Sequence, residues 1–160
     1  MGPARLYVVR RLLPMEALTI VGAVAACAQL VDLATRVTAN LGSLKRRWVD
    51  GAQSLQLLIA KLSTVRAALA QIKDWADFNA STSPGGAEMV ENLRAAMGAC
   101  QAIIEMLDSE VTLLLNETRV PRLRQLFSES TMKEYESRLN SQVAALQLLL
   151  TAAYWCVSLD

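Results

Sequence analysis

The chain has 160 residues, of which 53% are hydrophobic and 19% charged, and its net charge is +1. A chain of this length can bury the core of one ordinary domain without metal ions or disulfides as staples. The small net charge and the aromatic content of 5% give no basis for nucleic-acid binding, so no nucleic-acid partner is expected. The sequence has no histidine, which excludes His-dependent triads and removes the commonest metal ligand.

The three cysteines, Cys27, Cys100 and Cys156, are far apart and odd in number. Their spacing fits neither a zinc site nor a disulfide framework, so we interpret them as buried small hydrophobes in a reducing compartment. Carboxylates occur singly or one helical turn apart, and no histidine can activate a serine. The sequence therefore predicts a non-enzymatic protein without catalytic, cofactor-binding or metal-binding residues.

The most unusual stretch of the sequence, EALTIVGAVAACAQLVDLAT, begins at Glu16. Between Ala17 and Val31 only Thr19 and Gln29 interrupt an apolar, alanine-rich run. A membrane span needs about 20 residues, so the run is short for a span but long and apolar for an ordinary surface helix. We expect a first helix over residues 16–39, followed by Gly42 as a C-terminal cap residue.

The residues before this helix allow two targeting interpretations. Arg5, Arg10 and Arg11 precede the apolar run, as in a secretory signal peptide, and an arginine-rich, acid-free start is also typical of a mitochondrial presequence. Against a signal peptide, polar residues follow the run and no small-x-small cleavage site is evident. We therefore treat residues 1–14 as a basic extension, either native or left by cloning, and residues 15–160 as the helical bundle domain.

Three further helices are predicted over residues 44–78, 87–118 and 131–157. Each has apolar residues at alternating steps of three and four, which is typical of a seam that faces other helices. The predicted seams are Leu55, Leu58, Leu62, Val65, Leu69, Ile72 and Ala76, then Val90, Leu93, Met97, Cys100, Ile104, Leu107, Val111 and Leu114, and finally Met132, Tyr135, Leu139, Val143, Leu146, Leu150 and Ala153.

The connections between these helices carry strong breaking signals. Residues 79–86 (NASTSPGG) predict a loop. Pro121 disfavours helical geometry in the residue before it, which leaves residues 119–127 as a basic joint with room for a short additional helix. Thr131 and Glu134 have capping-box spacing and predict the start of the last helix. The expected fold is therefore all-α, an up-and-down four-helix bundle.

Small residues give the first helix a second distinctive property. Gly22 and Ala26 have small-xxx-small spacing, which permits close approach of helix backbones, in membranes especially. A central glycine also costs about 1 kcal/mol of helix stability relative to alanine. That cost is easier to understand if the helix packs tightly or changes partners. Two interpretations stay open, a membrane-capable helix and a buried central helix in a tight bundle.

A family resemblance favours the membrane-capable interpretation. The segment MEALTIVGAVAACAQLVDLATRV resembles the start of the HeLo-like domain at the N-terminus of fungal NOD-like receptors (STAND proteins). The resemblance continues through LQLLIAKLSTVRAALAQI and returns in LFSESTMKEYESRLNSQVAALQLLLTAA, which is similar to the last helix of that family. It covers residues 15–157. These domains are related to the bundle of mixed lineage kinase domain-like protein and to the coiled-coil domains of plant resistance receptors. The extension over residues 1–14 departs from the family, whose functional helix begins at the chain start.

The resemblance implies a domain that executes programmed cell death in fungal innate immunity and heterokaryon incompatibility. Oligomerisation would cluster the bundles, and their first helices would permeabilise the membrane. The residues implied to insert are Glu16, Leu18, Ile20, Val21, Gly22, Val24, Ala26, Leu30 and Val31. Glu16 and, less directly, Asp32 are implied to line a pore, whereas the alternative for both is a helix-terminal charge.

Partners and location also come from the resemblance. It implies homo-oligomerisation on activation, contact with anionic phospholipid and a downstream nucleotide-binding receptor domain. The expected location is cytoplasmic at rest and the plasma membrane on activation. An alternative from a different class is a signalling adaptor, a helical bundle that recruits a protein partner and keeps its first helix permanently in the core.

Overall fold

The computed structural model describes the backbone of residues 3–78, 86–116 and 128–158, and the side chains of residues 20–78, 88–116 and 128–155. Its helices are α1 (Pro3–Arg47), the 3-10 turn η1 (Val49–Gly51), α2 (Ala52–Phe78), α3 (Gly86–Leu115) and α5 (Glu129–Ser158). No strand occurs in the part of the chain that is described. Most of the predicted loop and the whole predicted basic joint, with its additional helix, lie outside the described residues.

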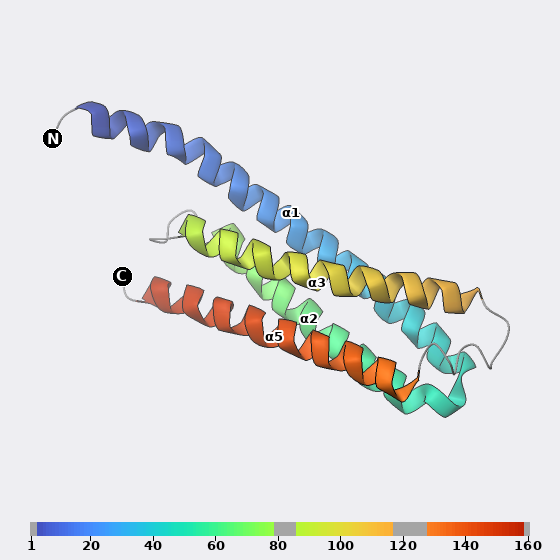
Figure 1. The fold of residues 1–160 in the computed structure, drawn as a ribbon. Coiled ribbons are helices and arrows are strands. Elements are labelled where there is room, and N and C mark those ends of the chain that lie inside the picture. Colours follow the sequence, from blue (N-terminus) through green and yellow to red (C-terminus); the bar gives the residue numbers. More distant parts are fainter. Residues whose placement is uncertain (1–2, 79–85, 117–127, 159–160) are drawn as a thin grey trace.

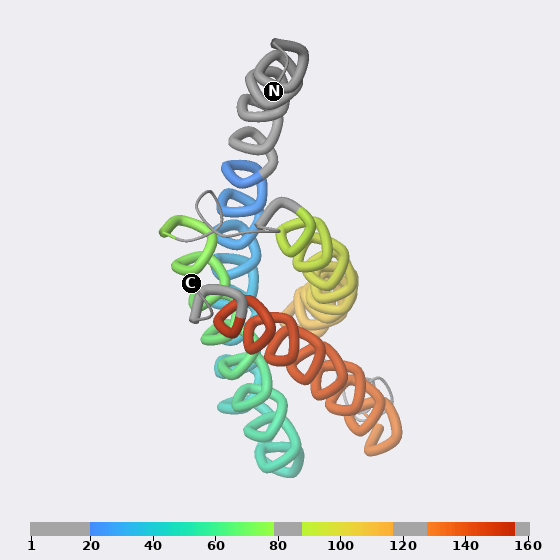
Figure 2. The backbone as a smooth tube through the Cα atoms, turned by 90° about the vertical axis from the view of Figure 1, so that its left-hand side faces the viewer, coloured from blue at the N-terminus to red at the C-terminus, as the bar shows by residue number. Residues whose placement is uncertain are grey.

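The four long helices form one bundle. α1 packs against α2 and α3, and α5 packs against the same two helices, so α1 lies diagonally opposite α5 and α2 diagonally opposite α3 (Figure 1 and Figure 2). Chain direction alternates from each helix to the next (Figure 1), which confirms the expected all-α, up-and-down four-helix bundle. Around the bundle, however, the order is α1, α2, α5, α3. The neighbours α2 and α5 therefore run in the same direction. Both finish at the end of the bundle where α3 begins.

The three predicted seams are confirmed residue by residue. All the predicted seam side chains of α2, α3 and α5 are buried, and they form the core together with a row of residues from α1 and with Ala68, Trp75 and Ile103, which were not predicted. Most are leucine, isoleucine or valine, each of which contributes about 1.5–3 kcal/mol when removed from water. A core of this kind can stabilise a four-helix bundle through burial of apolar side chains alone.

The row contributed by α1 was not predicted. It steps by three and four from the N-terminal side of the helix to its last turn and consists of Ala23, Cys27, Leu30, Ala34, Val37, Leu41 and Leu44, followed by Trp48 after the helix. The helix is also longer than predicted in both directions. Gly42 is not a cap but an interior residue, because Leu44 and Trp48 continue the buried row beyond it.

The boundary between α1 and α2 lies at Trp48–Gly51 rather than at Gly42. The buried indole of Trp48 lies over the turn, and a Cβ atom at Gly51 would sit 2.4 Å from that ring. Only glycine therefore fits at this position of the turn. The backbone N–H of Trp48 donates to the carbonyl of Leu44 at 2.9 Å and closes the last turn of α1.

The start of α5 is also earlier than predicted. The helix begins at Glu129, and the backbone N–H of Thr131 donates to the Ser128 hydroxyl at 3.3 Å. Ser128 therefore caps the helix, and the capping box predicted from Thr131 and Glu134 is wrong. At the other end of the preceding helix, α3 stops at Leu115, short of the predicted residue 118.

Candidate functional site: the first helix and its groove

The residues implied to insert into a membrane occupy different environments along α1. The side chains of Glu16 and Leu18 lie outside the described residues. Leu30 is a core residue, whereas Val21 is 65% exposed. The other members of the set are partly buried against the core or, for the glycine, half-buried; they are Ile20, Gly22, Val24, Ala26 and Val31. The structure thus brings the predicted set together on one helix, but on more than one of its faces.

The segment Ile20–Ala28 has no polar side chain on any face. Only Ala23 and Cys27 of this segment are buried, and both Val21 and Ala25 are exposed on the opposite side. A helix that is apolar all round is ordinarily buried in a large core or in a membrane. Here the bundle covers one face fully and the flanks in part, so the apolar outer surface at Val21 and Ala25 lacks the partner that its composition favours.

Soft sulfur contacts fasten this segment to α3. The Cys27 thiol donates to Met97 Sδ at 3.0 Å, and Cys100 lies one turn further along the same seam. Burial raises the pKa of the Cys27 thiol to about 11, with nearby Lys73 opposing the shift. Burial alone raises the pKa of the Cys100 thiol to about 11. Both thiols are therefore neutral at pH 7, as expected for small hydrophobes, whereas the side chain of Cys156 lies outside the described residues.

Two grooves flank α1 over the same part of its length. On the α3 side, a groove of about 170 Å³ is lined by Ala26, Gln29, Leu30, Leu33, Gln101 and Glu105. On the α2 side, a second groove of about 310 Å³ is lined by Ala28, Val31, Asp32, Ala70, Lys73 and Asp74. Ala26 and Ala28 contribute to this space beside the seam, so α1 is less closely packed at its flanks over this part of its length.

Gly22 contributes to the looseness of this docking. A Cβ atom at Gly22 would meet only the end of the Arg94 side chain, at 3.0 Å from Nη2. The close neighbour is therefore a flexible guanidinium group and not a helix backbone. In this state of the bundle, the small residue does not serve close packing between helix backbones.

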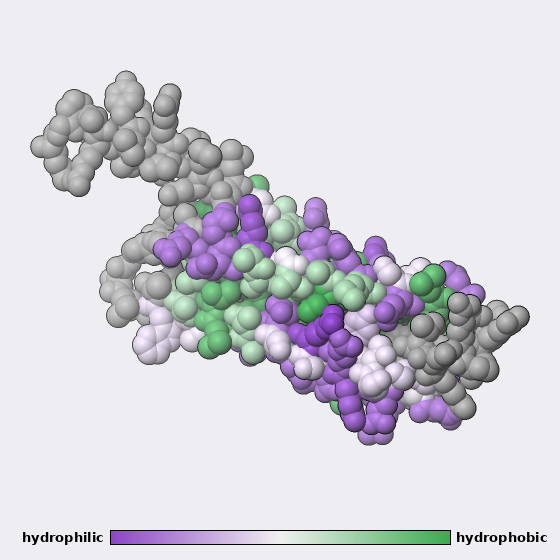
Figure 3. All heavy atoms as spheres, in the orientation of Figure 1, coloured by the Kyte–Doolittle hydropathy of each residue, from purple (hydrophilic) through white to green (hydrophobic). Residues whose placement is uncertain are grey.

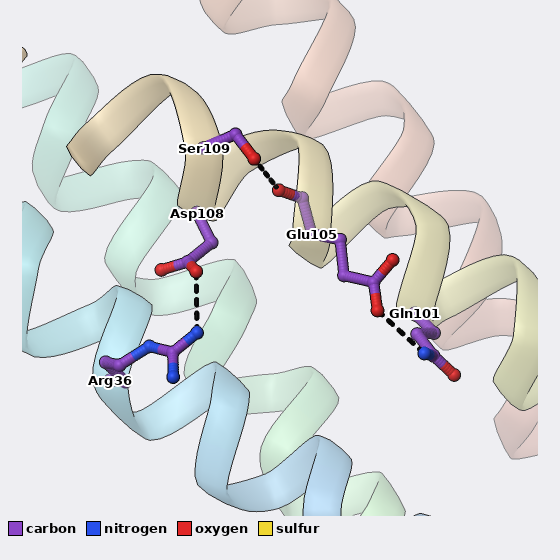
Figure 4. A network of polar contacts seen from close by, with 5 residues as sticks. All are labelled: Arg36, Gln101, Glu105, Asp108 and Ser109. Carbon is purple, nitrogen blue, oxygen red and sulfur yellow. Dashed lines mark hydrogen bonds and ion pairs between the residues drawn. The ribbon is translucent and has the colours of Figure 1, made fainter. Parts of the chain in front are cut away.

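Past Ala34, α1 is fastened by polar contacts as well as by larger core residues. Arg36 Nη2 donates to Asp108 Oδ2 at 2.6 Å, beside the hydrogen bonds that link Gln101, Glu105 and Ser109 along α3 (Figure 4). This hydrogen bond raises the pKa of the Arg36 guanidinium. At the end of the helix, Arg47 Nη1 donates to the Leu115 carbonyl at 2.8 Å.

Asp32, implied as a pore-lining residue, is exposed beside Lys73 and Asp74 in the α2-side groove. Among the described side chains, no group of three His, Cys, Asp or Glu residues lies close enough to hold a metal ion. The described outer surface of the N-terminal part of α1 is apolar at Val21 and Ala25.

By length and composition, two helices could cross a membrane. They are Ile20–Arg47 and Val49–Phe78, with 28% and 39% of their most apolar windows buried in the bundle. The core helix of a soluble protein and a signal sequence meet the same criterion. The sequence predicts only the first of these candidates, because the second has the pattern of a bundle seam with charged flanks.

Fold and site together define an all-α four-helix bundle with apolar helices, one of which contains a segment, Ile20–Ala28, that is apolar on every face and only partly covered. No protein-family model, no curated protein and no solved structure matches the chain.

Proposed function

We propose that this chain is the membrane-targeting effector domain of a fungal NOD-like receptor of the STAND class, a HeLo-like domain that executes regulated cell death. One observation carries the proposal. The segment Ile20–Ala28 is apolar on every face, yet only the row through Ala23 and Cys27 is buried. Transfer into a bilayer would cover the remaining faces, which the bundle leaves in contact with water.

In the proposed mechanism, a downstream nucleotide-binding domain clusters several bundles at the plasma membrane, after which the N-terminal part of α1 leaves its groove. Departure of this part exposes apolar seam residues of α2 and α3, which favours self-association. The apolar run up to Val31 spans about 22 Å at 1.5 Å per residue, less than the roughly 30 Å of a hydrocarbon core. Local thinning of the bilayer, or extension of the inserted part through Ala34, makes up the difference.

The expected preference for anionic phospholipid depends on the first 14 residues. They carry three of the 16 basic residues and none of the 15 acidic ones, so the remainder of the chain is slightly acidic. Basic side chains next to an apolar helix attract anionic headgroups. In the same proposal, Glu16 and Asp32 take the pore-lining positions once the helices are assembled.

A charge at Val21 tests the proposal without disturbing the bundle, because this side chain is 65% exposed. Val21→Asp adds roughly 2.5–3.5 kcal/mol to insertion of each helix, which corresponds to a loss of roughly a hundredfold in the insertion equilibrium. Val49→Asp is the matched control, since Val49 is 79% exposed and lies after the helix. We expect Val21→Asp to retain its circular dichroism and unfolding midpoint while dye leakage from vesicles and cell killing collapse. Undiminished leakage would refute membrane insertion by α1.

A second pair of variants tests whether inserted helices pack through small residues. Gly22→Leu keeps α1 apolar and displaces only the end of Arg94, and Gly42→Leu is its control because a Cβ atom there meets nothing within 4 Å. We expect Gly22→Leu to bind vesicles but to release far less dye from them than Gly42→Leu does. Equal leakage by both variants would mean that helix packing in the membrane does not pass through Gly22.

The adaptor function has one structural observation in its favour. The buried row of α1 is continuous from Ala23 to Trp48, as expected for a helix that stays in the core. An adaptor would keep this row buried while it signals. If the folded wild-type chain releases no dye from vesicles and Val21→Asp leaves cell killing unchanged, the adaptor function takes the place of the effector function.

A further inference from the structure

The exposed aromatic side chains of the described residues gather at one end of the bundle. Three of the six aromatic residues with described side chains are buried in the core, namely Trp48, Trp75 and Tyr135. The other three are exposed: Phe78 by 78%, Tyr154 by 46% and Trp155 by 71%. Phe78 is the last residue of α2, and Tyr154 and Trp155 lie in the last turns of α5. We refer to these three residues as the aromatic end.

These positions come together because α2 and α5 pack side by side and run parallel (Figure 1 and Figure 2). The apolar segment of α1 lies at the same end. Gly22 is next to Arg94 near the start of α3, and Cys27 lies within the electrostatic influence of Asp77, the neighbour of Phe78. The aromatic end and the uncovered segment of α1 are therefore parts of the same end of the molecule.

The surface continues from the aromatic end along α5. Leu148 is exposed and lies two helical turns before Trp155, on the same face of the helix. In Figure 3, hydrophobic side chains gather over the C-terminal half of α5 and the adjoining part of α3, whereas the N-terminal half of α5 is hydrophilic. The opposite end of the bundle exposes aliphatic residues, Val49 and Leu113, near the basic group Lys45–Arg47.

We infer that the aromatic end is a bilayer-docking surface, which seats its rings at the headgroup level and orients α1 toward the lipid; the inference rests on the proposed function. Tryptophan and tyrosine combine an apolar ring with a polar tip, and they are enriched where membrane and water meet. Phenylalanine and leucine beside them supply purely apolar contact. A surface that docks proteins would also contain exposed aromatics, but their position at the same end of the bundle as the apolar segment of α1 favours the bilayer.

The charged side chains near the aromatic end indicate which lipid headgroups it would contact. Basic and acidic side chains are mixed at this end, with Lys73 and Arg94 near Asp77 and Glu91. The described charged residues near the aromatic end therefore show no excess of positive charge that would select anionic headgroups. Docking through the rings should persist on neutral phosphatidylcholine and depend little on salt, unlike the attraction expected from Arg5, Arg10 and Arg11.

The test compares two double variants of the full chain on phosphatidylcholine vesicles at low and high salt. Phe78→Ser with Trp155→Ser removes two exposed rings, and Val49→Ser with Leu113→Ser removes two exposed aliphatic side chains from the opposite end. We expect the first pair to weaken the partition coefficient by at least tenfold at both salt concentrations, and the control pair to change it by less than twofold. Brominated lipid should quench wild-type tryptophan emission more than that of Trp155→Phe.

Several outcomes would overturn the inference. Equal losses for the two pairs, or bound protein in which Trp155 is not quenched, would place the contact elsewhere. A change in oligomer size without a change in partition would assign the surface to a second copy of the chain. The proposed function fails separately: if Val21→Asp still permeabilises vesicles while the aromatic pair abolishes their binding, docking stands and insertion by α1 does not.

Discussion

The two halves of the described part of α1 lie in the same groove between α2 and α3, but different side chains hold them there. Over residues 20–34 the buried row consists of Ala23, Cys27, Leu30 and Ala34. Over residues 36–48 it consists of Val37, Leu41, Leu44 and Trp48.

Side-chain size makes this difference energetic. A fully buried large apolar side chain contributes about 1.5–3 kcal/mol, and an alanine methyl contributes about 0.8 kcal/mol. The later half also has the cross-helix contacts of Arg36 and Arg47, while grooves flank the earlier half on both sides. One continuous helix thus combines a firmly held C-terminal half with an N-terminal half that costs less free energy to release. The proposed insertion requires release of the N-terminal half.

Truncation of one leucine in each half is the most direct way to break this comparison. Leu41→Ala should lower the free energy of unfolding by about 4 kcal/mol, because the well-packed site cannot collapse around the cavity. Leu30→Ala should cost about 2 kcal/mol, since Leu30 already borders a groove. Urea unfolding followed by circular dichroism measures both values. Equal losses would mean that the two halves are held equally well.

Alkaline pH should weaken the N-terminal half of α1 selectively, because it favours deprotonation of the thiols that hold this half against α3. Burial raises the pKa of Cys27 and Cys100 from 9.0 to about 11, so between these values the unfolded chain loses protons that the folded chain retains. The stability contributed by the neutral thiols is therefore complete well below pH 9 and is lost as the pH rises from 9 to 11, by about 2 kcal/mol for each thiol.

Urea titrations at pH 8 and pH 10.5 measure this loss. Cys27→Ala with Cys100→Ala is the control, and its stability should depend less on pH over this interval. The same slope in the wild type and in the control would show that the thiols are not the groups responsible.

Loss of the ion pair between Arg36 and Asp108 should lower stability less than the leucine truncations or the alkaline pH shift do. The Arg36 side chain is 62% exposed and the Asp108 side chain 19%, so water and salt reach the pair through the guanidinium group and screen it. Asp108→Asn should shift the urea midpoint by an amount near the resolution of the titration, and the shift should vanish at high salt. A large, salt-independent loss would instead make this pair a principal anchor of α1.

Most of the core positions of α2, α3 and α5 were predicted from the sequence, but the buried residues Ala68, Trp75 and Ile103 were not. Every predicted position is buried, because leucine, isoleucine and valine at steps of three and four stand out from charged neighbours. The row in α1 follows the same steps but uses alanine and cysteine, such as Ala23 and Cys27, among other small apolar residues. No polar neighbour marks its edges there, so the pattern was present but could not be distinguished from its surroundings.

Helix boundaries were predicted less accurately from the sequence than the buried seams. Gly42 has the local chemistry of a cap, yet the burial of Leu44 and Trp48 carries the helix past it. Likewise Thr131 has capping-box spacing, but Ser128 makes the capping hydrogen bond. Local signals identify residues that are able to end a helix, and tertiary packing selects among them.

For the candidate site, the sequence alone determined that residues 20–28 form an apolar segment, because composition is a property of the chain itself. Which face of that segment is covered could not follow from it, since a helix without polar residues has no preferred side. Only the tertiary structure decided that Ala23 and Cys27 face the bundle while Val21 faces outward. The choice depends on the surfaces that α2 and α3 present, and their order around the bundle arises from contacts between residues far apart in the chain.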